Sequence, residues 1–178
     1  MMFSIQYPLD DSIEFEGETY QINASFDNIL KVLDVLEERL PEIVLIDVCL
    51  KLLIGDYLDE LEHKEILLVK ILDKYLKTKP KTMIDIAGNE LPLPEEEADE
   101  VLDFKEDAGL IYAAFYQTYK IDLIEEQGKL HWLKFKSLLN GLPAGTALSK
   151  VIEIRQWTPD KKNYKAQMQM LKDKYRLR

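Results

Sequence analysis

The sequence has little of the residue types from which many active sites are built. One cysteine and two histidines occur in 178 residues, whereas a structural zinc site takes about four such ligands. The seven glycines are not clustered, so a glycine-rich phosphate loop is missing, and no Gly-x-Ser-x-Gly motif occurs. We therefore expect no catalytic residues, no metal site and no cofactor. An enzyme ranks last among the function classes that we consider.

Long apolar runs are also missing. The first ten residues lack the basic start and apolar stretch of a secretory signal. No segment approaches the roughly 20 apolar residues that a bilayer-spanning helix needs. Cys49 has no second cysteine to pair with, which is typical of a reducing compartment. These absences predict a cytosolic protein that makes no contact with membranes.

Negative charge dominates, but it is unevenly distributed. The net charge is −10, and residues 160–178 hold seven basic and two acidic side chains. That segment has a net charge of +5, so residues 1–159 carry −15. The acidic body disfavours nucleic acid as a partner. The basic end could contact a phosphate backbone, an acidic partner or the body itself, and we favour a terminal helix that packs on this protein.

The order of periodic segments predicts a mainly α fold with a small N-terminal β-hairpin (α+β), in one compact multi-helix domain over residues 1–178. Alternating apolar and polar residues on both sides of Gly17 predict the hairpin. A long acidic connecting loop contains three of the seven prolines and precedes a second set of helices. The expected parts are a hairpin at 13–23, a first helical part at 24–78, the loop at 79–103, a second helical part at 104–158 and a basic C-terminal helix at 159–178.

Two helices of the first part carry specific expectations. The segment that follows Pro41 is apolar on most faces up to Gly55, which predicts a helix in the middle of the core. The next helix is expected to begin near Asp56 or Asp59 and to reach Tyr75. Within the loop, a short strand is expected at residues 83–86. Thr146 is the expected N-cap of a helix in the second part.

Aromatic side chains are the candidates for partner contacts. Tyr112, Tyr116 and Tyr119 lie close together and cover more than one face of an expected helix, and tyrosine and tryptophan dominate binding hot spots. Trp132 fits the buried face of the next helix, which places His131 at its rim. Hydrogen bonding of His131 to a backbone group or a carboxylate is the simpler interpretation. The candidate partner-binding residues are Tyr112, Tyr116, Tyr119, His131 and Trp157.

Three long segments resemble a known family. They are IEFEGETYQINASFDNILKV, DFKEDAGLIYAAFYQTYKIDL and LHWLKFKSLLNGLPAGTALSKVIEIR, in this order along the chain. Together they are similar to the bacteriophage gene-product-fifteen family of phages and prophages. The resemblance implies a tail-module protein of the host bacterial cytoplasm, similar in size and genetic setting to tail assembly chaperones. It brings no catalytic residues.

The resemblance and the missing catalytic motifs together suggest a phage tail morphogenesis factor. The first hypothesis is a tail assembly chaperone that binds the tape-measure protein and keeps it soluble during assembly. The second is a structural tail component, a connector or completion protein that stays in the virion. The third is a nucleic-acid-binding or regulatory protein that acts through the basic C-terminal helix. The expected partners are tape-measure or other tail proteins, and self-association into a homo-oligomer stays open.

Overall fold

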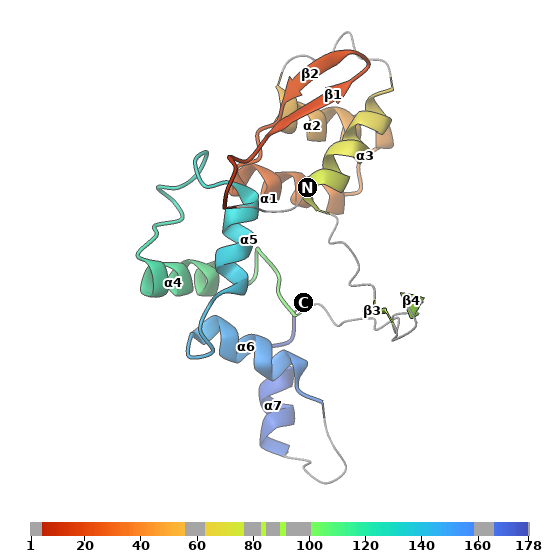
Figure 1. Cartoon of the computed structure of the whole chain (residues 1–178). Helices are drawn as coiled ribbons and strands as arrows, with labels where there is room; N and C mark the ends of the chain where they lie inside the picture. The colour runs from red at the N-terminus through yellow and green to blue at the C-terminus, as the bar shows by residue number, and fades with distance from the viewer. Residues whose placement is uncertain are drawn as a thin grey trace. The chain divides into compact units, whose positions relative to one another are not determined.

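A computed structural model describes residues 5–55, 63–76, 83–84, 90–91, 101–158 and 166–177. The chain divides into two compact units, each made of two separate stretches of sequence (Figure 1). Unit 1 comprises Met1–Lys77 and Leu123–Asn140, and unit 2 comprises Thr78–Asp122 and Gly141–Arg178. Each unit is therefore completed by a segment that is distant in sequence. The expectation of a single domain stays a prediction.

The N-terminal hairpin of unit 1 has strands β1 (Ser12–Phe15) and β2 (Glu18–Gln21) in antiparallel register, with Phe15 opposite Glu18. Glu16 and Gly17 form the two-residue turn with φ of 51° and 87°. Positive φ at both positions is the geometry of a type I′ turn, whose twist matches that of the strands. Ile13 and Phe15 are buried on one face of β1, as the alternation in the sequence predicts.

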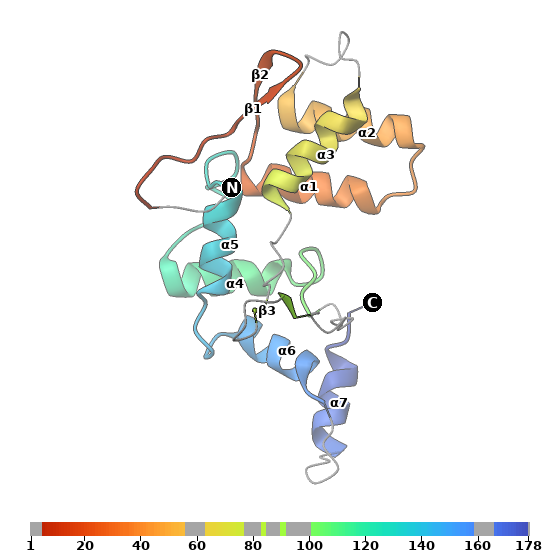
Figure 2. The same ribbon diagram turned by 45° about the vertical axis from the view of Figure 1, so that its right-hand side comes forward.

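Four helices complete unit 1: α1 (Phe26–Glu37), α2 (Glu42–Ile54), α3 (Lys64–Tyr75) and α5 (Trp132–Asn140). Helix α1 packs against α2 and α5, and α2 packs against α3 (Figure 2). Helix α3 begins at Lys64, because His63 has a left-handed backbone with φ of 52°. The expected start near residue 56 or 59 is therefore too early, and residues 56–62 lie outside the described part.

Backbone pairing joins the two stretches of unit 1. The Phe26 amide donates to the Leu130 carbonyl at 2.9 Å, and the Trp132 amide donates to the Ala24 carbonyl at 2.8 Å. These bonds bring the start of α5 beside the start of α1. The Phe135 ring then stacks on the Phe26 ring with centroids 4.9 Å apart. Trp132 is 3% exposed, which confirms its predicted place in the core.

Helix α2 departs from its predicted environment. Its inner face buries Cys49, Leu50, Leu53 and Ile54. Its outer face exposes Ile43, Val44 and Val48, and the exposed fraction of Ile43 is 75%. The prediction of a helix in the middle of the core is therefore wrong for this outer face. Burial on all sides needs neighbours on all sides, and α2 packs against α1 and α3 only along its inner face.

Unit 2 contains the helices α4 (Ala108–Tyr119), α6 (Ala147–Gln156) and α7 (Ala166–Lys174). Helix α6 packs against both α4 and α7. Thr146 caps α6 as predicted, because its Oγ1 accepts a hydrogen bond from the Ser149 amide at 3.1 Å. Strands β3 (Met83–Ile84) and β4 (Glu90–Leu91) pair antiparallel, so the short strand expected at 83–86 is present at its first two residues.

The predicted fold class is confirmed: the described residues form seven helices and an N-terminal antiparallel hairpin. Most of the expected acidic loop 79–103 lies outside the described residues, as does the expected start of the C-terminal helix at residues 159–165. None of the helices in the described part has the length and apolarity needed to cross a membrane.

Candidate partner-binding surfaces

Helix α4 carries three of the five candidate residues. Its inward positions Ile111, Ala114 and Phe115 are buried. The Tyr112 and Tyr116 rings stack with centroids 6.2 Å apart, and Tyr116 is 50% exposed. The Tyr112 hydroxyl donates a hydrogen bond to Asp122 at 3.0 Å. The structure therefore brings two of these tyrosines into one stacked pair, and Tyr116 is its most accessible member.

Trp157 and His131 take other positions. Trp157 is the C-cap of α6 and is partly buried, and its carbonyl accepts a hydrogen bond from Lys172 Nζ at 3.1 Å. It belongs to unit 2 with the three tyrosines, whereas His131 belongs to unit 1. The five candidates are therefore distributed over both units. Their role in partner binding stays a prediction.

His131 is held on both ring nitrogens within unit 1. Its Nδ1 lies 3.0 Å from the Leu133 amide, which donates to it. This contact fixes the ring proton on Nε2, and Nε2 donates to Asp11 Oδ1 at 2.7 Å. The ring thereby acts as the N-terminal cap of α5 and as a link to the chain just before β1. His131 is only 9% exposed. These contacts confirm the simpler interpretation, in which His131 is hydrogen-bonded to a backbone group and a carboxylate.

Asp11 and the end of α3 extend this network. The Tyr75 hydroxyl donates to Asp11 Oδ1 at 3.1 Å. Burial, together with the adjacent negative charge of Asp11, raises the pKa of Tyr75 far above its ordinary value. The Tyr75 carbonyl accepts from both Trp132 Nε1 and Lys136 Nζ, each at 3.1 Å. The last turn of α3 is thus capped by two side chains of α5, and burial lowers the pKa of Lys136.

Unit 2 has a buried ion pair at its centre. Arg155 of α6 donates to both oxygens of Asp107, at 2.5 and 2.9 Å, and the two residues are 8% and 2% exposed. Its remaining bonds go to the Val101 and Tyr175 carbonyls, at 3.0 and 2.6 Å. One guanidinium therefore joins the segment before α4, the start of α4 and the end of α7. Nothing in the sequence marked this pair, because its partners are far apart along the chain.

Helices α2 and α3 carry an exposed apolar surface that the sequence patterns did not predict. Exposed aliphatic residues alternate with charged ones on the outer faces of both helices, and Lys64 Nζ contacts Asp47 Oδ1 at 2.9 Å where the two helices meet. The apolar surplus of α2 is the sequence signal for this surface, but the same surplus also predicts a helix that is buried on all sides. The exposed aliphatic residues are Ile43, Val44 and Val48 on α2, and Ile66 and Val69 on α3.

The described residues contain no cluster of three or more histidine, cysteine or acidic side chains that could hold a metal ion. Burial raises the pKa of the Cys49 thiol, which works against reactivity. These features define a mostly helical protein with an N-terminal hairpin, buried polar networks in both units and apolar side chains on the outer faces of α2 and α3.

The family model described as Bacteriophage Gp15 protein matches residues 6–177, and the chain belongs to this family. The match covers nearly the whole chain and confirms the resemblance drawn from its three long segments. Membership indicates a phage structural or morphogenesis protein that interacts with other phage proteins. No curated protein and no solved structure gave a match to the chain.

Proposed function

We propose that the protein is a tail assembly chaperone that binds the tape-measure protein of the same phage and keeps it soluble until the tail tube polymerises. The observation that carries this proposal is the apolar surface of unit 1. Five aliphatic side chains on the outer faces of α2 and α3 are 37–75% exposed. Such residues at neighbouring exposed positions are typical of protein-binding surfaces.

The charges around these residues support reversible binding. On the outer face of α3, Ile66 and Val69 alternate with Glu65, Lys70 and Asp73. Charged neighbours keep an exposed apolar surface soluble when the partner is absent. The net charge of −10 also opposes self-aggregation. A chaperone needs an exposed apolar surface and also needs to stay soluble without its client, because it must cover apolar segments of the client and later release them.

Co-expression with the tape-measure protein tests the proposal. We expect the tape-measure protein to be soluble and to co-purify only when this chain is present. Ile66→Lys with Val69→Lys places charge on the outer face of α3 and should abolish both effects. Glu65→Gln is the matched control, because it changes charge on the same face without removing apolar surface. Equal solubility of the tape-measure protein with and without the chain would refute the chaperone function.

Purified tails separate this function from the second hypothesis. A chaperone should be absent from finished tails, whereas a connector or completion protein would be found there at a fixed ratio to other tail proteins. Mass spectrometry of tails purified through a density gradient makes the distinction. Detection at a fixed ratio would replace the chaperone with the structural component.

A further inference from the structure

The two edges of the N-terminal hairpin differ in how their backbone groups are satisfied. In a hairpin closed by a two-residue turn, the pair next to the turn exchanges hydrogen bonds, and every second pair does so. Phe15–Glu18 and Ile13–Tyr20 are therefore the bonded pairs. The amides and carbonyls of Ser12 and Glu14 point outward from β1, and those of Thr19 and Gln21 point outward from β2.

Side chains cover the outer edge of β1. Lys70 Nζ donates to the Glu14 carbonyl, and Lys74 Nζ donates to the Ser12 carbonyl, each at 2.6 Å. The Ser12 amide donates to Asp10 Oδ1 at 2.9 Å. Lys70 and Lys74 are one turn apart on α3, so they reach alternate carbonyls of the strand. Three of the four outward groups of β1 therefore have a partner within unit 1.

The outer edge of β2 has no such cover. No hydrogen bond from any described residue reaches the amides or carbonyls of Thr19 and Gln21, and both residues are exposed. A strand edge with unpaired amides and carbonyls is a template for a further strand. Because β2 is only four residues long, it offers at most four backbone hydrogen bonds, which favours weak and specific binding over aggregation.

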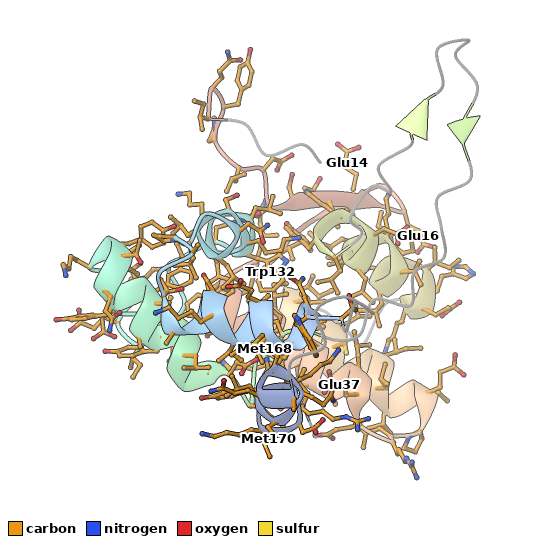
Figure 3. The ribbon with its side chains drawn as sticks, turned by 90° about the horizontal axis from the view of Figure 1, so that it is seen from below. Glu14, Glu16, Glu37, Trp132, Met168 and Met170 are labelled. Atoms are coloured by element: carbon orange, nitrogen blue, oxygen red, sulfur yellow. The ribbon has the colours of Figure 1, made fainter. Side chains whose placement is uncertain are left out.

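The side chains around this edge define the chemistry of its occupant. Glu14, Glu16 and Glu18 are exposed along the hairpin, and Figure 3 shows the first two on it. Residues opposite one another share a face, so Glu18 and Tyr20 lie on the face of Phe15 and Ile13. An added strand would place side chains directly beside Glu18 and Tyr20. A basic residue fits the first position and an apolar residue fits the second.

We propose that the open edge of β2 binds an extended polypeptide segment that carries a lysine or arginine opposite Glu18 and an apolar residue opposite Tyr20. The segment adds a third strand to the hairpin through the backbone groups of Thr19 and Gln21. This surface is separate from the outer faces of α2 and α3, and the proposal does not depend on the chaperone function. Charge complementarity selects a basic segment over the acidic hairpin of a second copy of this chain.

A synthetic peptide tests the proposal on the full chain. Its core is Thr-Val-Thr-Lys, which in antiparallel orientation puts Val beside Tyr20 and Lys beside Glu18, and one further lysine flanks each end. Thr19→Pro removes the outward amide and keeps the pairing with β1, because proline is tolerated at a strand edge. Thr19→Val keeps the amide and is the matched control. We expect the proline variant to bind about tenfold more weakly and the valine variant to bind like the wild type.

Two further measurements make the result specific. On peptide addition, the amides of Thr19 and Gln21 should become protected from hydrogen exchange in NMR spectra, while the Ser12 amide should not change. Glu18→Gln should weaken binding and reduce its dependence on salt. Far-UV circular dichroism of each variant verifies that the hairpin and helices are retained.

Several results would overturn the proposal. These are absence of peptide binding to the wild type, equal binding by the proline variant, and equal loss in the proline and valine variants. A peptide in which glutamate replaces every lysine should not bind, and equal affinity for it would remove the charge argument. Self-association of the wild-type chain that Thr19→Pro abolishes would assign the edge to a second copy instead.

Discussion

The two units stabilise their helices by different means. Of the buried apolar residues in the described part of the chain, eighteen belong to unit 1 and five to unit 2. Unit 1 has stacked rings and aliphatic packing at its centre, with its polar network around His131 at the rim. The described part of unit 2 has few buried apolar side chains and places a two-residue ion pair among them. A small apolar core therefore makes unit 2 more dependent on its polar contacts.

The polar networks differ in charge as well as in burial. Arg155 and Asp107 have side chains that are 9% and 3% exposed, whereas Asp11 in the His131 network is 32% exposed. Removing one member of a buried ion pair leaves the other charge without compensation. Loss of His131 leaves a carboxylate that water already reaches. Removing one member of the polar network should therefore lower the free energy of unfolding much more in unit 2 than in unit 1.

The largest effect is expected from Arg155→Met. It leaves the Asp107 carboxylate buried without its cation, and we expect a loss of about 3–5 kcal/mol in the free energy of unfolding. Adding Asp107→Asn removes the buried charge and should recover much of this loss. Lys150→Met is the matched control, because Lys150 is exposed on the same helix. If Arg155→Met alone were as stable as Lys150→Met, the stabilising role of the ion pair would be contradicted.

The two tryptophans allow each unit to be followed separately in urea unfolding. Trp132 lies in unit 1 and Trp157 in unit 2. In the Trp157→Phe variant, Trp132 is the remaining tryptophan and reports on unit 1. In the Trp132→Phe variant, Trp157 remains and reports on unit 2. Coincident transitions would support the expectation of a single domain. If the units unfold independently, Arg155→Met should shift only the transition of unit 2.

A smaller effect is expected from His131→Ala. It removes the cap of α5 and the hydrogen bond to Asp11, and we expect a loss of about 1–2 kcal/mol. His131→Asn should recover part of this loss, because asparagine is a good N-cap and can accept from the Leu133 amide. Thermal unfolding followed by circular dichroism makes the comparison. Equal stability of the alanine and asparagine variants would show that the cap contributes little.

Local patterns in the sequence predicted much of the fold. The alternation around Gly17, the cap at Thr146 and the buried position of Trp132 all depend on residues close together in the chain, and the structure confirms each of them. The environment of α2 was predicted incorrectly, because an apolar sequence does not reveal how many neighbours will cover it. Exposed Ile43 and buried Leu50 have the same signal in a single sequence.

The polar networks and the open strand edge depend on contacts between residues that are far apart in the sequence. Arg155 and Asp107 are 48 residues apart, and His131 and Asp11 are 120 apart. No local period relates such positions. The open edge of β2 was not predictable for the same reason, because it is defined by the lysines of α3 that cover only the other edge. The sequence did mark the tyrosines of α4, since aromatic residues on more than one helix face are a local feature.

The smallest effect concerns a carboxylate at the start of α1 and sharpens the contrast with the buried pair of unit 2. Burial alone would raise the pKa of Asp27, but the Gly128 amide and the Lys31 ammonium outweigh it, and the pKa is lowered. The hydrogen bonds are 2.8 Å from the Gly128 amide to Oδ1 and 3.1 Å from Lys31 Nζ to Oδ2.

A lowered pKa means that the folded state favours the ionised carboxylate. Its stabilisation is present above the ordinary aspartate pKa of about 4 and is lost as the pH falls through the lower pKa of the folded state. The free energy of unfolding of the wild type should therefore exceed that of Asp27→Asn by about 1 kcal/mol at neutral pH, and this difference should vanish in acid. Urea unfolding of both proteins between neutral pH and pH 3 measures it. A difference that does not change with pH would mean that the charge of Asp27 makes no net contribution, and that its partners serve only to position the loop before α5.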